Sequence, residues 1–359
     1  MMSSHRKFIN LAHNIATKNF GKTFPNPTVG CIISKNNKII SKGVTSATGR
    51  PHAEEIALKK AGIKAKGATM YVTLEPCFHS SQNGSCTDQI LRSGIKEIFI
   101  SCIDQDARTK NKSIKKLKRN KIKVVTGIEK EKTISINNFF FKSLKKKKPF
   151  TKVKMAISKD EKIAWSDYKS KWISNSKSRS YVHSIRHKSQ AILTTSKTIL
   201  KDNPRFTVRK KNKIIKNMNV AIIDKNLNIP FNSRLLKNLH ERRIIIFTSK
   251  NNLKSKKLKQ LGCEIIQMKV KNKELNLKKI FTHLYKLKIS DLLVEAGGIL
   301  FSNLIKNNLV DELHLFRAPI IIGNNGIPVI KENSLINIKK NLLEKIKFDD
   351  NLYTKHSIK

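Results

Sequence analysis

The chain has 359 residues, 39% of them hydrophobic and 6% aromatic, which allows two domains that each bury a core. It contains no apolar run long enough for a membrane span and no signal-peptide core near its start, so we expect a cytoplasmic protein without a membrane partner. Its five cysteines form no disulfide framework, which fits a reducing compartment, and its net charge of +49 raises the question of a nucleic-acid partner.

The first half alternates predicted helices and strands. An amphipathic helix is expected over residues 5–20, followed by a buried strand over 29–33 and another strand at 39–40. The pattern continues with a helix over 52–61, a strand over 68–74, a helix over 87–93 and a strand over 97–102. This alternation predicts a layered α/β sandwich with a metal at the helix N-termini.

Two short motifs combine the residue types of a catalytic zinc site. His52-Ala53-Glu54 is followed by Pro76-Cys77 and later by Cys86. One imidazole and two thiolates leave one position of a zinc ion open, as a catalytic site requires. The pattern matches the zinc-deaminase signature, although eight residues instead of two separate the cysteines.

The same residues predict a mechanism. Zinc bound by His52, Cys77 and Cys86 lowers the pKa of a bound water, and Glu54 shuttles a proton from that water to a departing amino group. The alternative is a surface His-Ala-Glu with two unrelated cysteines. That alternative is disfavoured because all four residues occur in the expected order, with a proline before the first cysteine.

The pattern restarts after a lysine run that ends at Pro149. Residues 145–149 are predicted to link domains at 1–148 and 149–359, and a solvated helix end is a compatible explanation. Beyond them, helices are expected over 176–187 and 300–306, and strands over 150–157, 190–194, 219–223, 243–248, 263–268 and 291–295. Gly297-Gly298 either leaves backbone N–H groups free for a phosphate or only forms a tight turn. The chain has no G-x-G-x-x-G motif, so a standard dinucleotide fold is not supported.

The charge does not by itself identify a nucleic-acid-binding protein. Lysine, isoleucine and asparagine are abundant along the whole chain, and the lysines are scattered through both halves without clustered aromatic residues. Compositional drift is therefore our preferred interpretation, with no specific nucleic acid as partner. Salt-sensitive, nonspecific adherence to nucleic acid is still expected.

The first half resembles the bacterial bifunctional deaminase–reductase family of riboflavin biosynthesis. The resemblance rests on residues 25–31, 51–54 and 73–77 together with Cys86. It implies a cytidine-deaminase-like, three-layer α/β domain over 1–148 that uses Zn²⁺. Its substrate would be 2,5-diamino-6-(5-phosphoribosylamino)pyrimidin-4(3H)-one. The long cysteine spacing is usual in that family, whereas residues 78–85 and 104–107 depart from its pattern.

The second half resembles the reductase domain of the same family, whose fold is similar to dihydrofolate reductase and which takes NADPH. The matching stretches are residues 171–174, 191–194, 202–209, 294–298 and 309–312. The resemblance implies a product with a ribityl side chain, 5-amino-6-(5-phosphoribitylamino)uracil. It places NADPH contacts at Ala156, Trp172, Thr198, Asp202, Gly297, Gly298, Ile299 and Leu300. It places substrate contacts at Ser170, Arg186, Phe206, Arg209 and Glu295, and the arginines suit a phosphate.

One departure concerns the reductase half. The family's Ser-Leu-Asp-Gly is Ser158-Lys159-Asp160-Glu161 here, and Glu161 would strain a turn that needs a positive φ. We expect reduced or normal reductase activity, with a phosphoribosylated pyrimidine as the small-molecule partner and a homo-oligomer left open. The alternatives are a tRNA-type deaminase with a basic extension, a deaminase with a decayed reductase domain, and a non-enzymatic basic binding protein.

Overall fold

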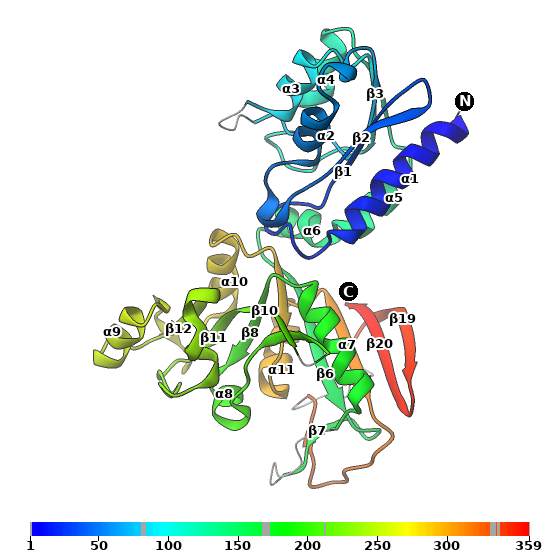
Figure 1. Cartoon of the computed structure of the whole chain (residues 1–359). Helices are drawn as coiled ribbons and strands as arrows, with labels where there is room; N and C mark the ends of the chain where they lie inside the picture. Colours follow the sequence, from blue (N-terminus) through cyan, green and yellow to red (C-terminus); the bar gives the residue numbers. More distant parts are fainter. Residues whose placement is uncertain are drawn as a thin grey trace. The chain divides into compact units, whose positions relative to one another are not determined.

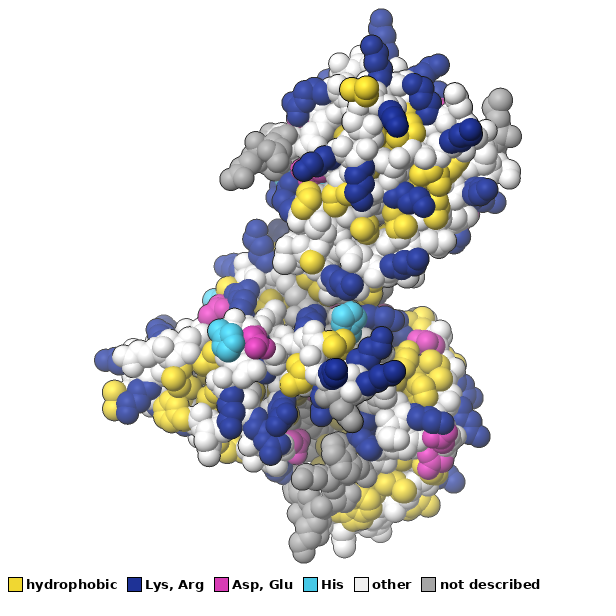
Figure 2. Space-filling view, in the orientation of Figure 1, with side chains coloured by type: hydrophobic (Ala, Val, Ile, Leu, Met, Phe, Trp, Pro, Cys, Tyr) yellow, Lys and Arg dark blue, Asp and Glu magenta, His cyan; other side chains and the backbone are white. Residues whose placement is uncertain are grey.

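The computed structural model describes residues 2–79, 84–166, 173–211, 213–330, 335 and 338–358. The chain divides into two compact units, Met1–Lys147 and Lys148–Lys359 (Figure 1). Within the described ranges, no helix combines the length and apolar character that crossing a bilayer requires. On the face shown in Figure 2, lysine and arginine side chains are spread over the surface of both units.

The first unit is built on a five-stranded sheet in the order β2-β1-β3-β4-β5. β1 (Gly30–Lys35) pairs antiparallel with both β2 (Lys38–Val44) and β3 (Thr69–Leu74). β3, β4 (Glu97–Cys102) and β5 (Lys123–Thr126) run parallel. The helices of this unit are α1 (Met2–Lys18), α2 (Ala53–Ala61), α3 (Cys86–Arg92), α4 (Lys112–Arg119), α5 (Lys130–Ile136) and α6 (Asn138–Lys146).

Alternation along the strands divides the apolar side chains of this sheet between two cores. Ile32, Tyr71 and Phe99 join the cluster formed with α1, whereas their neighbours on the same strands join the cluster formed with α2, α3 and α4. Successive side chains of a strand point to opposite faces, so both faces are covered. α1 and α5 lie side by side in Figure 1, and His13 Nε2 is 2.8 Å from Thr133 Oγ1 between them.

The second unit contains a nine-stranded sheet in the order β13-β12-β11-β8-β16-β6-β17-β20-β19. Its strands run in one direction except for β20, which pairs antiparallel with both β17 and β19 and forms a terminal hairpin with β19. The sheet comprises β6 (Phe150–Ile157), β8 (Ala191–Thr195), β11 (Asn219–Ile223), β12 (Ile244–Thr248), β13 (Glu264–Gln267), β16 (Asp291–Val294), β17 (Glu312–Arg317), β19 (Lys340–Phe348) and β20 (Asn351–Ile358). The central strands are buried on both faces, as is typical of parallel sheets.

Five α-helices, a 3-10 helix over Arg234–Glu241 and three two-stranded ribbons complete the described part of this unit. The helices are α7 (Ser176–His187), α8 (Ser196–Asp202), α9 (Leu253–Gln260), α10 (Leu277–Lys286) and α11 (Gly298–Lys306). The ribbons pair β9 (Thr207–Lys210) with β10 (Lys213–Asn217), β7 (Lys162–Ala164) with β18 (Ile327–Pro328), and β14 (Val270–Lys271) with β15 (Glu274–Leu275).

Most predicted elements occur within two or three residues of their expected bounds, and β4, β6, β11 and α7 have those bounds. The sequence analysis did not predict α4, β5, α5 and α6, nor the β19–β20 hairpin. Cys77 follows the carboxyl end of β3, and Glu295 follows the carboxyl end of β16. Ligands of open α/β sheets commonly bind at such ends.

Candidate active site

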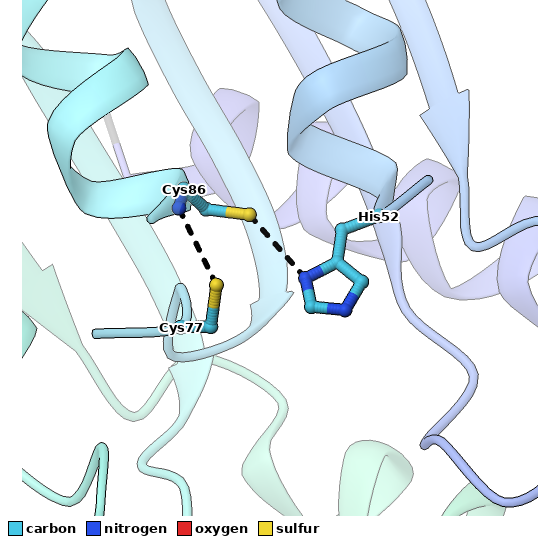
Figure 3. Close-up of side chains that lie close together, drawn as sticks. All are labelled: His52, Cys77 and Cys86. Atoms are coloured by element: carbon cyan, nitrogen blue, oxygen red, sulfur yellow. Dashed lines mark hydrogen bonds between the residues drawn. The ribbon is translucent and has the colours of Figure 1, made fainter. Parts of the chain in front are cut away.

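His52, Cys77 and Cys86 come together in the first unit, as the motif predicts. One ligand atom from each residue lies within 4.8 Å of the other two. Cys86 Sγ is 3.4 Å from His52 Nδ1, and the Cys86 amide donates to Cys77 Sγ at 3.3 Å (Figure 3). Among the described residues, this is the cluster of metal-ligating side chains that could hold an ion.

Local structure fixes each of these side chains. His52 directly precedes α2, and its backbone N–H donates to Glu55 Oε2 at 2.6 Å. Cys77 follows β3, and its carbonyl accepts from the Thr87 hydroxyl at 2.8 Å. Cys86 begins α3 directly after the N-cap residue Ser85 (Figure 3). The site therefore stands on the first turns of two helices and the end of one strand.

The donor set fits a zinc ion. Ligands about 2.0–2.3 Å from a tetrahedral zinc lie up to about 3.8 Å apart, so small side-chain rotations would bring all three atoms onto one ion. Hydrogen bonding from Cys86 lowers the pKa of Cys77 to about 4, which favours the thiolate that a metal binds. Both sulfurs are buried, and three protein ligands leave a fourth position for water or substrate.

Glu54 is close to this site but outside the cluster of ligand atoms. Its side chain is buried on the first turn of α2, and burial raises the pKa of Glu54 to about 7, although the charge of His52 opposes this shift. A carboxyl group with a pKa near neutrality can both accept and release a proton at ordinary pH. The burial and the pKa of Glu54 thus suit a proton shuttle.

Other polar residues lie near the cluster of His52, Cys77 and Cys86. Burial lowers the pKa of His79, on which Cys77, Arg108, Asp106 and Arg50 also act electrostatically. Asp106 is held by Arg108, with a shortest N–O distance of 2.5 Å. The sequence analysis did not assign His79 to the site, although it follows Cys77 by only two residues.

The loop around Asn26 contacts the segment that precedes His52. Asn26 Nδ2 donates to the Gly49 carbonyl at 2.9 Å, and a Cβ on Gly49 would lie only 2.7 Å from the Asn26 side chain. Gly49 has a φ of +93°, so a glycine is required both by its conformation and by this close approach.

In the second unit, three of the predicted substrate residues come together. Arg186 Nε and Nη2 donate to the two carboxylate oxygens of Glu295 at 2.6 and 2.8 Å, and Arg186 Nη1 donates to the Thr207 carbonyl at 3.0 Å. The Arg186 guanidinium lies over the Phe206 ring, 5.9 Å from its centre. Phe206 is buried and has a φ of +47°. Arg209 lies on β9 with an exposed side chain, and its amide donates to His183 Nδ1 at 3.3 Å.

Lys154 is a member of this cluster that the sequence analysis missed. It lies on β6, its pKa is lowered by burial, and Glu295, Arg186 and Asp202 all act on it electrostatically. The sequence did contain one indication of a functional role, because Lys154 is a charged residue in the middle of a strand predicted to be buried. Its partners are far away in the sequence, so only the fold reveals them.

The predicted NADPH residues lie on separate elements. Ala156 is on β6, and Thr198 and Asp202 belong to α8, whose N-cap Thr195 accepts from the Thr198 amide at 3.3 Å. Gly297 caps α11 and Gly298 begins it. The Ile299 side chain is exposed, whereas Leu300 belongs to the core. Trp172 and Ser170 lie outside the described residues.

The two units match two known domain families. Residues 2–102 match the cytidine and deoxycytidylate deaminase zinc-binding region, and residues 149–351 match the RibD C-terminal domain. The RibD riboflavin biosynthesis protein of Aquifex aeolicus is 36% identical over 341 residues, which are 93% of this chain and 94% of that protein. The chain belongs to the RibD family of riboflavin biosynthesis proteins.

Two solved structures support the same conclusion. RibD from Acinetobacter baumannii superposes with a TM-score of 0.90 at 28% identity, with 100% of both chains covered. A Thermotoga maritima protein described as diaminohydroxyphosphoribosylaminopyrimidine deaminase/5-amino-6-(5-phosphoribosylamino)uracil reductase gives a TM-score of 0.85 at 29% identity, with 99% of both chains covered.

RibD membership confirms the main predictions. The fold is α/β, with a cytidine-deaminase-like first domain and a dihydrofolate-reductase-like second domain. The predicted family, a bifunctional deaminase and reductase of riboflavin biosynthesis, is the one that the comparisons identify. Zn²⁺ and NADPH are the cofactors of these two domain types, and the cysteine–histidine cluster has the composition that zinc requires.

Proposed function

We propose that this chain deaminates 2,5-diamino-6-(5-phosphoribosylamino)pyrimidin-4(3H)-one and then reduces its ribosyl group to a ribityl group. The observation that carries the proposal is the convergence of His52, Cys77 and Cys86 in the first unit, beside the buried carboxyl of Glu54. The deaminase activity is assigned to residues 1–148 and the reductase activity to residues 149–359. The unpaired, buried state of all five cysteines supports a reducing, cytoplasmic location.

In the deamination, water replaces an amino group on the pyrimidine ring, so that a carbonyl and ammonia are formed. His52, Cys77 and Cys86 would hold a zinc ion, which supplies a Lewis acid that lowers the pKa of a bound water. Glu54 takes a proton at its carboxylate and returns it to the leaving nitrogen. Its burial keeps bulk water from competing for that proton.

In the reduction, NADPH supplies the hydride, and the protein binds and orients the two reactants. The segment from Gly297 to Leu300 would contact the cofactor together with Ala156, Trp172, Thr198 and Asp202. Ser170, Arg186, Phe206, Arg209 and Glu295 would contact the pyrimidine ribotide. Arg209 has the exposed guanidinium suited to a phosphate, and Lys154, beside Glu295 and Asp202, is positioned to hold a proton for a ribose oxygen.

The purified protein tests this proposal directly. The diaminopyrimidine ribotide is supplied with and without NADPH, and ammonia release and NADPH absorbance are followed separately. We expect ammonia in both cases and NADPH oxidation only after deamination. Ammonia without NADPH oxidation would identify a decayed reductase, and neither reaction in zinc-loaded protein would overturn the assignment.

A further inference from the structure

The turn between β6 and β7 contains a residue in an unfavourable backbone conformation. Glu161 has a φ of +61°, which is uncommon for a residue with a Cβ. Such conformations persist when the surrounding contacts determine them, and they cluster at functional sites. The contacts of Glu161 therefore indicate what holds it there.

The Glu161 side chain joins two separate parts of the second unit to this turn. Its Oε1 accepts from Arg317 Nη2 at 3.3 Å at the end of β17, and its Oε2 accepts from the Leu335 amide at 3.2 Å. Arg317 Nη1 also donates to the Lys159 carbonyl at 3.1 Å, so this arginine holds the turn at two points. These side-chain contacts would be lost if the position were glycine.

Neighbouring residues fasten the same turn to the segment after β17. Asp160 accepts from the amides of Ile322 and Gly323 at 3.1 and 2.8 Å. The Glu161 carbonyl accepts from the Val329 amide at 3.0 Å, and β7 pairs with β18 beside it. In Figure 1 the chain after β17 passes close to β7. The turn thus sets the position of Pro328 and Val329.

Val329 in turn packs against the start of α11. A Cβ added to Gly298 would lie 2.5 Å from the Val329 carbonyl oxygen and 3.0 Å from that of Pro328. Gly298 is the first residue of α11, and residues 297–300 are the expected NADPH contacts. The backbone anchored by Glu161 therefore supports the helix end at which the NADPH contacts are expected.

We propose that Glu161 is a positioning residue of the NADPH site. Its carboxylate ties the turn to Arg317 and Leu335, and the turn held in this way presents the Glu161 carbonyl to the Val329 amide. This arrangement keeps the start of α11 in one position for the cofactor. The proposal rests on the reductase activity proposed above. It explains why a side chain occupies a position where the backbone favours glycine.

Four variants test it in the full chain. Glu161→Ala removes the side-chain contacts, Glu161→Gly removes them and also relieves the backbone, and Glu161→Gln keeps an oxygen that can accept from Leu335. Glu264→Ala is the matched control, because Glu264 pairs with Arg243 at 2.7 Å on the surface at the other edge of the sheet. For each variant, KM for NADPH, KM for the pyrimidine, kcat and the unfolding midpoint are measured.

We expect Glu161→Ala and Glu161→Gly to raise KM for NADPH about three- to tenfold, the loss expected for one or two hydrogen bonds. KM for the pyrimidine, kcat and ammonia release should stay near the wild-type values. The KM for NADPH of Glu161→Gln should lie between those of the wild type and Glu161→Ala, and the KM of Glu264→Ala should equal that of the wild type. If Glu161→Gly is more stable than the wild type and has the same KM for NADPH, Glu161 is only a strained turn residue and the proposal is wrong.

Failure of the proposed function would be recognised separately. A wild-type protein that oxidises no NADPH contradicts the reductase assignment, whatever the Glu161 variants do. In that case NADPH binding, titrated by quenching of tryptophan fluorescence, still tests the positioning role. Equal dissociation constants for wild type and Glu161→Gly would overturn it.

Discussion

Arg186 donates two hydrogen bonds, of 2.6 and 2.8 Å, to the carboxylate of Glu295, and the two side chains are only 15% and 11% exposed. Burial acts to raise the pKa of Glu295, but the charge and hydrogen bonds of Arg186 outweigh burial and lower it. Glu295 is therefore held ionised in the centre of the candidate reductase site. Arg186 fixes this carboxylate with the two donors that it could otherwise offer to a phosphate.

Replacing Arg186 by methionine should leave a buried carboxylate without its principal partner. We expect the second unit to lose about 3 kcal/mol of unfolding free energy and NADPH oxidation to fall, while ammonia release persists. Both tryptophans, Trp165 and Trp172, belong to this unit, so tryptophan fluorescence in urea reports its unfolding. Arg243→Met, which breaks an exposed pair, should cost less than about 1 kcal/mol. Equal small losses for both variants would contradict this account.

Glu54→Gln should abolish deamination without removing the metal. The amide cannot shuttle protons, so we expect ammonia release to fall at least about 100-fold. Zinc content, measured by atomic emission, should stay at the wild-type level, and the variant should still reduce the deaminated pyrimidine when it is supplied. Persistent deamination would exclude Glu54 as the proton shuttle.

Removal of zinc should stop the deamination and leave the NADPH-dependent reduction unchanged. Dialysis against a chelator is expected to stop ammonia release, and added zinc should restore it, because His52, Cys77 and Cys86 provide the proposed ligands. Cys86→Ser should bind zinc weakly and respond poorly to its addition, whereas Cys263→Ser, a buried cysteine of the second unit, serves as the control. Deamination at full rate in metal-free protein would contradict the zinc mechanism.

Acid should destabilise the second unit through Glu312. Burial acts to raise the pKa of Glu312, but the His314 ring, whose Nε2 is 3.3 Å from the carboxylate, and the charge of Lys355 lower it to about 2. Because the folded-state pKa is below that of the unfolded chain, this group stabilises the fold above about pH 4.3, and the contribution is lost as pH falls toward 2. Glu312→Gln should be less stable at neutral pH and change less between about pH 5 and pH 3, as followed by tryptophan fluorescence. A wild-type pH dependence in the variant would assign the effect to other carboxylates.

The sequence predicted those parts of the fold whose local pattern is unambiguous. β6 and β11 are short apolar runs, and they occur at the predicted residues. α4 was missed because only Ile114 and Leu117 are buried apolar residues among its lysines, which resembles a charged loop in so basic a chain. The β19–β20 hairpin was missed because exposed Leu342 and Leu343 break the alternation expected of a strand.

The candidate zinc site and the candidate reductase site also differ in how far local sequence patterns predict them. The zinc cluster was predicted because its residues stand in two short motifs with recognisable chemistry. Lys154 was missed because its neighbours, Arg186, Asp202 and Glu295, come from three distant segments that only the sheet topology brings together. The strain at Glu161 was expected from its departure from the family pattern, but its contacts with Arg317 and Leu335 required the structure.

Mass spectrometry of the pyrimidine after incubation with the zinc-loaded protein tests the central claim most directly. With NADPH present, the account predicts a single product in which an amino group has been replaced by a carbonyl oxygen and two hydrogens have been added. Without NADPH, only the first change should occur. Recovery of unchanged diaminopyrimidine ribotide under both conditions would contradict the account.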